Sequence, residues 1–203
     1  MSSAIQCPPG LTEFTPTEVL STAQDDLEWE PTKSVKLYTN AFVLSSDRKK
    51  ILLGLKKRGF GVNKWNGFGG KVEAGETPLQ AAKRELKEES GVDSNLQQAG
   101  VLFFQLHNYE FAHKVYIFRA EEYTGEITES EEMRPQWFST EDKEGAGGVP
   151  YDQMWEDDRY WLALLIKDQA FVGRCDFGVS PSGDKNGGDS PMTRVWFASV
   201  DHF

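Results

Sequence analysis

The stretch GKVEAGETPLQAAKRELKEESGV, residues 70–92, constrains this chain more tightly than any other part of its sequence. Its ends predict a helix. Thr77 is a good N-cap, Pro78 suits the first helical position, and Gln80 completes a capping-box pattern with Thr77. Gly91 suits a left-handed cap at the C-terminal end. We therefore expect a turn containing glycines, a helix, and a second glycine turn.

At about 100° per residue, Leu79, Ala82 and Leu86 form one apolar stripe along this helix. Three carboxylates fall on an adjoining arc of about 100°: Glu85, Glu88 and Glu89. Like charges this close destabilise a helix unless cations compensate them. Hard oxygen ligands favour Mg²⁺ or Mn²⁺ over zinc. A solvated acidic face is the plainer alternative, but the coincident glycines and arginine favour a metal site.

The same stretch follows a spaced pattern: a glycine, five residues, Glu, seven residues, then Arg-Glu-apolar-x-Glu-Glu-x-Gly-apolar. The chain in this respect resembles the Nudix hydrolases, which cleave nucleoside diphosphates linked to another group. The resemblance implies an α/β fold with a mixed β-sheet between helices and the Nudix loop-helix-loop. The matching positions are Gly70, Glu76, Arg84, Glu85, Leu86, Glu88, Glu89, Gly91 and Val92.

The resemblance also implies roles for these residues. Besides binding the metal, Glu89 would position or deprotonate water. Arg84 would orient the glutamates, and Glu76 would be mainly structural. The implied metal ligands are the carbonyl of Gly70 and the side chains of Glu85, Glu88, Glu89 and, beyond the motif, Glu132. The expected cofactor is Mg²⁺, with Mn²⁺ as a substitute.

Composition limits the partners. The 203 residues are enough for one sizeable core. The net charge of −10 argues against DNA or RNA as a partner, whereas a metal would neutralise the phosphates of a small nucleotide. Two cysteines give no disulfide framework, and neither a secretory signal nor a membrane span is visible. We expect a monomer in the cytoplasm, with a nuclear or mitochondrial fraction as an alternative.

Residues 1–32 combine prolines with an acidic run and are expected to form a mobile tail. Residues 33–203 would form a single domain with a flexible loop at 180–191, and residues 145–148 mark a shorter loop. A second helix is expected at 158–169. The expected strands are 35–44, 50–56, 98–106, 114–120, 136–138, 171–177 and 194–200.

Segments outside the motif resemble one branch of the family, the oxidised purine nucleoside triphosphatases or 8-oxo-dGTPases. They are KKRGFG at 56–61, KWNGFGG at 64–70, EEMRP at 131–135 and MWEDDRYW at 154–161. The resemblance covers about residues 35–177. The substrate-binding residues that it implies are Thr39, Lys56, Phe60, Asn66, Gly69, Gly70, Lys71, Met133, Trp155, Asp157, Asp158 and Trp161.

These residues suit a purine pocket chemically. Phe60 and Trp155 can sandwich a base, and Asn66 offers both a donor and an acceptor to a purine edge. Asp157 and Asp158 would face the base and share one proton. The alternatives are ordinary roles: aromatic residues in the core and aspartates that favour the start of the second helix.

The sequence thus predicts metal-dependent hydrolysis of oxidised purine nucleoside triphosphates, such as 8-oxo-dGTP and 2-hydroxy-dATP, to the monophosphate and pyrophosphate. This reaction sanitises the nucleotide pool and avoids DNA damage. Attack at the α or the β phosphorus is left open. The alternatives are another Nudix substrate, such as a dinucleoside polyphosphate or nucleotide sugar, a nucleotide sensor that does not hydrolyse, or an interaction protein that uses its acidic tail.

Overall fold

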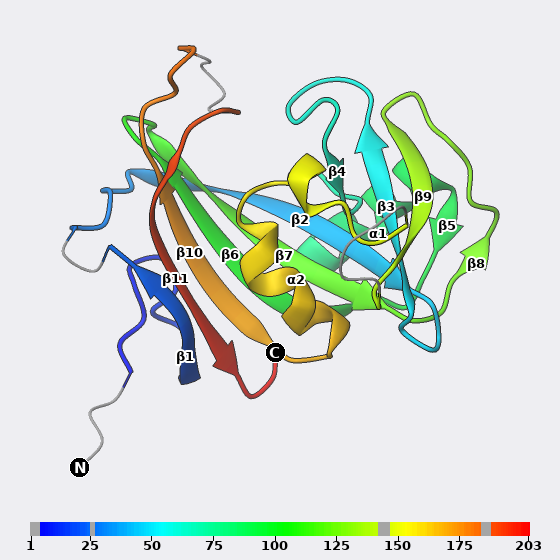
Figure 1. Ribbon diagram of the computed structural model, residues 1–203, viewed down its shortest axis with the longest axis horizontal. Coiled ribbons are helices and arrows are strands. Elements are labelled where there is room, and N and C mark those ends of the chain that lie inside the picture. The colour runs from blue at the N-terminus through cyan, green and yellow to red at the C-terminus, as the bar shows by residue number, and fades with distance from the viewer. Residues whose placement is uncertain (1–4, 25–26, 142–146, 184–187) are drawn as a thin grey trace. The chain divides into compact units, whose positions relative to one another are not determined.

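The computed structural model describes residues 5–24, 27–141, 147–183 and 188–203. Parts of the expected loops at 145–148 and 180–191, and of the expected tail, lie outside these ranges. The chain forms two compact units. The first unit comprises residues 1–36, 99–115 and 160–203, and the second comprises residues 37–98 and 116–159. Figure 1 labels their helices and strands.

The second unit is built around strand β3 (Lys50–Lys56). Strand β9 (Met133–Ser139) pairs antiparallel with β3 over its whole length. The other edge of β3 is shared: Leu52 pairs with β2 (Ser34–Leu44) and Gly54 pairs with β4 (Trp65–Asn66). Two short strands, β5 (Val92–Asp93) and β8 (Thr124–Gly125), form a separate ladder.

Helix α1 (Pro78–Ser90) begins and ends where the sequence predicts. Thr77 and Gln80 form the capping box, and Gly91 has a φ of 79°, in the left-handed region that favours glycine. Ala82 and Leu86 are fully buried and belong to the apolar core cluster of this unit, which also includes Phe68. Burial of a leucine side chain contributes about 1.5–3 kcal/mol.

One part of the predicted apolar stripe was wrong. Leu79 is 39% exposed, whereas Ala82 and Leu86, the other two residues of the stripe, are fully buried. Helical side chains lean toward the N-terminus, so a residue in the first turn projects past the packed turns. The anchoring face of α1 therefore starts one turn later than the periodicity suggests.

The first unit contains a mixed sheet. Strand β10 (Phe171–Phe177) is parallel to β6 (Gln97–Leu106) and antiparallel to β11 (Met192–Val200). The next neighbour of β6 is β7 (Phe111–Ala120). Strands β2, β6 and β7 are long and contribute residues to both units. The expected mixed sheet is thus present.

The first unit also contains most of helix α2 (Asp158–Ile166), which has two aromatic contacts with the sheet strands. Tyr160 stacks on Phe197 with ring centroids 5.3 Å apart, and Trp161 stacks on Phe171 at 5.5 Å. A single-turn 3-10 helix (Tyr151–Gln153) precedes α2 in the chain. No helix in the described parts of the chain has the length and apolar character needed to span a membrane.

The expectation of a mobile tail over residues 1–32 was wrong for much of that range. Residues 16–23 form strand β1 (Pro16–Ala23), which pairs antiparallel with β11. Leu11 is fully buried. Buried Arg174 donates to the backbone oxygens of Pro9 and Glu30. Composition misled here because pairing with β11 and the carbonyl contacts use backbone atoms, which leave no hydrophobic pattern in the sequence.

Candidate active site

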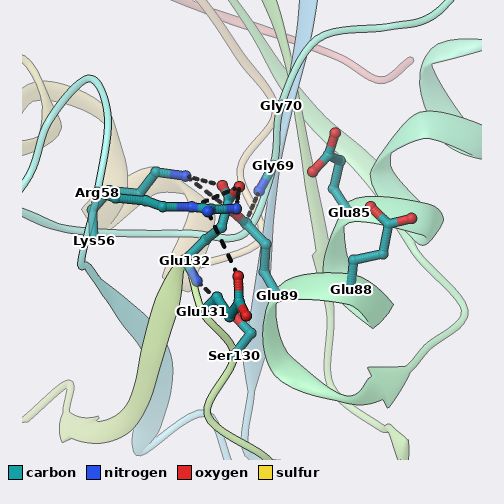
Figure 2. A pocket seen from close by; sticks show the side chains of 10 residues that line it. All are labelled: Lys56, Arg58, Gly69, Gly70, Glu85, Glu88, Glu89, Ser130, Glu131 and Glu132. Carbon is teal, nitrogen blue, oxygen red and sulfur yellow. Dashed lines mark hydrogen bonds and ion pairs between the residues drawn. The ribbon is translucent and has the colours of Figure 1, made fainter.

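A cavity of about 470 Å³ lies in the second unit, beside the C-terminal half of α1. Figure 2 shows the side chains that line it, among them the glutamates of α1 and two basic side chains, Lys56 at the end of β3 and Arg58 in the loop after it. Seven of the lining residues were predicted from the sequence: Lys56, Gly69, Gly70, Glu85, Glu88, Glu89 and Glu132. Three were not: Arg58, Ser130 and Glu131.

Arg84 organises the outer side of the acidic face. Its guanidinium donates to both carboxylate oxygens of Glu76, at 2.8 and 3.0 Å, and to Glu85 at 2.8 Å and Glu88 at 3.3 Å. The Arg84 hydrogen bonds lower the pKa of Glu76 to about 2. Arg84 thus contacts Glu76, Glu85 and Glu88 at once.

Glu89 is the most buried of the three helix glutamates, at 3% exposure. Its two oxygens accept from different groups: Oε2 from the N–H of Gly69 at 2.8 Å, and Oε1 from Lys56 Nζ at 3.1 Å. Burial raises the pKa of Glu89, although Lys56 and the Gly69 N–H both oppose the rise. Burial therefore favours a protonated Glu89, and the cation beside it favours the carboxylate.

Glu132 lies across the cavity from α1 and accepts from two cations. Lys56 Nζ lies 3.0 Å from Glu132 Oε2, and Arg58 Nη2 lies 2.6 Å from Oε1. These hydrogen bonds lower the pKa of Glu132. Burial lowers the pKa of Lys56, but Glu89 and Glu132 outweigh that effect, so the net pKa is raised. Lys56 therefore stays charged between two carboxylates.

The donor set suits a hard divalent cation, because carboxylate and carbonyl oxygens are the ligands that Mg²⁺ and Mn²⁺ prefer. Gly70 fits closely at this site: a Cβ there would come within 2.4 Å of Glu85 Oε1. Among the described residues, however, no three acidic, histidine or cysteine side chains converge as they would around an ion. The basic side chains pair with the carboxylates separately, so binding a cation would require side-chain rearrangement.

The loop before α1 is held against β2 by backbone pairing. Thr39 N–H donates to the Gly70 carbonyl at 2.9 Å, which leaves that oxygen one further lone pair. A Cβ on Gly69 would come within 2.0 Å of the Thr39 carbonyl, so this approach requires glycine. The hydroxyl of Thr39 is buried and has no hydrogen-bond partner among the described residues. A buried hydroxyl of this kind suits a ligand contact.

The expected sandwich of a base between Phe60 and Trp155 is not present. The two rings stack directly on each other, with centroids 4.8 Å apart and planes inclined by 25°. A base between them would need about 7 Å between the planes, twice the usual contact distance. Phe60 is also 55% exposed. Trp155 is therefore available to a base on at most one face while Phe60 covers the other.

The adjacent aspartates are both buried. Asp158 Oδ2 accepts from the N–H of Trp155 at 2.9 Å, and Asp158 N–H donates back to the Trp155 carbonyl. Burial, followed by the charge of Asp157, raises the pKa of Asp158 well above its ordinary value, although the Trp155 N–H and Lys64 oppose the rise. The backbone contact supports the role at the helix start, and the raised pKa supports a shared proton.

The remaining predicted pocket residues lie outside the cavity lining. Met133 is buried in the apolar cluster of the second unit, and Lys71 is exposed, with its carbonyl accepting from Arg84. Trp161 is 1% exposed and stacks on Phe171 in the first unit, which matches the core alternative. Asn66 is partly exposed, but its side-chain oxygen is already engaged by the N–H of Gly67.

The three cavity residues that were not predicted left little or no signal in the sequence. Arg58 follows Lys56 in the quoted basic run, and Glu131 precedes Glu132, so both could have been inferred as neighbours of expected ligands. Ser130 gave no signal.

Comparison with known proteins identifies a family and several named relatives. The NUDIX domain model matches residues 36–165. An oxidized purine nucleoside triphosphate hydrolase of Danio rerio is 48% identical over 143 residues, covering 70% of this chain and 86% of that protein. The Mus musculus protein of the same name is 46% identical over 143 residues, with the same coverage of both chains.

Among solved structures, the MutT protein of Bacillus halodurans superposes with a TM-score of 0.62 at 21% identity, covering 80% of this chain and 97% of that one. At this identity the likeness concerns the fold alone. The domain match and the curated relatives together establish that the chain belongs to the Nudix family.

Proposed function

We propose that this protein hydrolyses oxidised purine nucleoside triphosphates, such as 8-oxo-dGTP and 2-hydroxy-dATP, to the monophosphate and pyrophosphate. The observation that carries the proposal is the cavity that Glu85, Glu88, Glu89 and Glu132 line together with two basic side chains, Lys56 and Arg58. The substrate class follows from relatives that are 46–48% identical over most of their length and carry that name.

The site residues divide into groups with different tasks. Glu89 is the proposed base that orients or deprotonates the attacking water, because it is buried and one of its oxygens is fixed by the Gly69 N–H. Lys56 and Arg58 have long, positively charged side chains, and both line the cavity. They can release Glu132 and bind phosphate oxygens when a triphosphate enters.

The metal ligands of this proposal are Glu85, Glu88, Glu89, Glu132 and the Gly70 carbonyl, and the proposed cation is Mg²⁺, with Mn²⁺ able to substitute. When bound, such an ion screens phosphate charge, polarises phosphorus and lowers the pKa of water. Arg84 keeps the Glu85 and Glu88 carboxylates oriented by donating to both. The net charge of −10 is then compatible with a nucleotide substrate.

Purine binding is assigned to the neighbouring residues Thr39, Asn66, Trp155, Asp157 and Asp158. The buried hydroxyl of Thr39 and the raised pKa of Asp158 support this assignment, since a protonated carboxyl can donate to a base while its neighbour accepts. We further propose that the protein acts as a monomer in the cytoplasm and binds no nucleic acid polymer.

A pyrophosphate-release assay over normal and oxidised dNTPs with Mg²⁺ tests the proposal. We expect kcat/KM for at least one oxidised purine triphosphate to exceed that of dGTP and dATP. Equal or greater activity on a dinucleoside polyphosphate or a nucleotide sugar would replace this substrate class by another of the family. Complete inactivity on all nucleotides, with nucleotide binding retained, would indicate a sensor.

A further inference from the structure

The segment that carries Glu132 is the loop of residues 126–132, which connects β8 to β9 in the second unit. Two of its residues, Ser130 and Glu132, line the cavity together (Figure 2). Ser130 was not predicted from the sequence. Because the loop has no ladder of its own, the position of Glu132 depends on the individual contacts that hold this loop.

The first part of the loop packs against the end of α1. The N–H of Thr128 donates to the Ser90 carbonyl at 2.9 Å, one of the carbonyls that the end of a helix leaves without an intrahelical partner. A Cβ on Gly91 would come within 2.5 Å of the Glu126 carbonyl, so this approach requires glycine. Ser90 directly follows Glu89 in the chain. The loop is therefore anchored next to the most buried glutamate of the helix.

The last part of the loop is held by Lys57, the first residue after β3. The N–H of Lys57 donates to the Glu132 carbonyl at 2.8 Å. Its ammonium group donates to the Ser130 carbonyl at 2.7 Å and to the Glu129 carboxylate at 2.6 Å. The loop thus bridges the two elements that carry Glu89 and Lys56, one at each end of the bridge.

The hydroxyl of Ser130 fixes the turn from which the Glu132 side chain projects. Its oxygen accepts from the N–H of Met133 at 3.0 Å and from the N–H of Glu132 at 3.3 Å. The Ser130 N–H in turn donates to the Met133 carbonyl at 2.9 Å. A hydroxyl oxygen has two lone pairs, and both are used by these backbone groups. Ser130 is therefore committed to the local geometry of Glu132.

Reversing the chain would not by itself require this serine, because glycine, asparagine and aspartate serve in turns as well. Glu132, however, reaches the cavity from this loop, and its carboxylate accepts from Lys56 at 3.0 Å and from Arg58 at 2.6 Å. A shift of the loop backbone would move that carboxylate with it. A displacement of about 1 Å at a reacting group can cost on the order of 10²-fold in rate.

We infer that Ser130 is a positioning residue for the hydrolysis, and that it holds the Glu132 carboxylate in the cavity by accepting hydrogen bonds from the backbone of the Glu132 turn. The inference rests on the proposed function, in which Glu132 is a metal ligand, and extends it to a residue that contacts no reacting group. The whole effect of Ser130 on the reaction passes through Glu132. Partners that orient a ligand in this way are typically worth about 10–100-fold in metal affinity or activity.

The test compares Ser130→Ala, which removes the acceptor, with Ser130→Thr, which keeps it. Ser45→Ala is the matched control, because Ser45 Oγ also accepts from a backbone N–H, that of Lys50 at 2.9 Å, in the turn before the opposite end of β3. Glu132→Gln and the double variant with Ser130→Ala complete a double-mutant cycle. For each protein, kcat and KM for 8-oxo-dGTP at saturating Mg²⁺, Mn²⁺ binding without nucleotide by electron paramagnetic resonance, and thermal unfolding are measured.

We expect Ser130→Ala to lower kcat about 10-fold or more and to weaken Mn²⁺ binding by a similar factor, with KM for the nucleotide little changed. Ser130→Thr should restore most of both. In the Glu132→Gln background, Ser130→Ala should have no further effect, because the residue through which it acts is already disabled. Ser45→Ala should leave kcat and Mn²⁺ binding unchanged. If Ser130→Ala does not fold, Ser130→Cys takes its place, since sulfur is only a weak acceptor.

Unchanged kcat and Mn²⁺ binding in the folded Ser130 variant would overturn the inference, and so would an equal loss with and without the Glu132 carboxylate. A Glu132→Gln variant that behaves like the wild type would also overturn it, since Ser130 would then have nothing to position. A wild type that hydrolyses no nucleotide would refute the proposed function alone. The Mn²⁺ titrations around the cycle would still decide whether Ser130 acts through Glu132.

Discussion

The ammonium group of Lys56 lies 3.1 Å from Oε1 of Glu89, so the most buried glutamate of α1 has a cation beside it within the protein itself. The same ammonium group lies 3.0 Å from Glu132. Lys56 thus links the two sides of the cavity. A divalent cation entering here would compete with Lys56 for these carboxylates, and Lys56 would then be free to bind phosphate.

Glu89→Gln preserves size but removes the negative charge that would bind a cation and orient water. We expect kcat to fall at least about 10²-fold, the scale of losing a general base or a metal ligand, with the fold intact. Pyrophosphate release at saturating Mg²⁺ measures this. Glu73→Gln is the matched control, because Glu73 is exposed in the preceding loop. Near wild-type turnover of Glu89→Gln would refute the assignment.

Glu76→Gln removes the carboxylate that holds Arg84. The pKa of Glu76 is lowered from 4.5 to about 2 in the folded protein, so the unfolded chain binds more protons between these values. The stability from this ion pair should be fully present above pH 4.5 and decline as pH falls toward 2. Urea unfolding of wild type and variant from pH 7 to 3 measures it. A stability difference independent of pH would contradict this prediction.

Leu11→Ala should lower the free energy of unfolding by about 2–5 kcal/mol, the usual cost of truncating a buried leucine. Leu11 is fully buried in a segment whose composition suggested a tail. Val19→Ala, on the exposed face of β1, is the control and should cost much less. Chemical denaturation compares the two. Equal, negligible effects would support the original expectation that residues 1–32 form a mobile tail.

Asp157→Asn and Asp158→Asn should change the ratio of kcat/KM between 8-oxo-dGTP and 2-hydroxy-dATP unequally. A carboxyl pair sharing one proton can present a donor and an acceptor in either order, and losing one such hydrogen bond costs on the order of 1–3 kcal/mol. Asp152→Asn, at an exposed position, is the control. If both buried variants leave both substrates unaffected, these aspartates serve only the start of α2.

The sequence by itself determined the helix and its acidic face. Thr77, Gln80 and Gly91 act within one or two turns of their own positions, and the glutamate spacing follows from helical periodicity alone. The strands were likewise predicted closely wherever hydrophobic runs were long, as at Lys50–Lys56 and Phe171–Phe177. Such features depend on neighbours in the chain, so a single sequence contains enough information.

Tertiary structure decided which groups each side chain meets. Lys56 is 33 residues from Glu89, and Asn40 is 26 residues from Asn66, and no local pattern reports such contacts. The same holds for β1, whose order comes from backbone pairing with β11, and for Phe60, which stacks on Trp155 instead of leaving room for a base. Residue type sets what a group can bind, but only packing determines which of its donors and acceptors remain available.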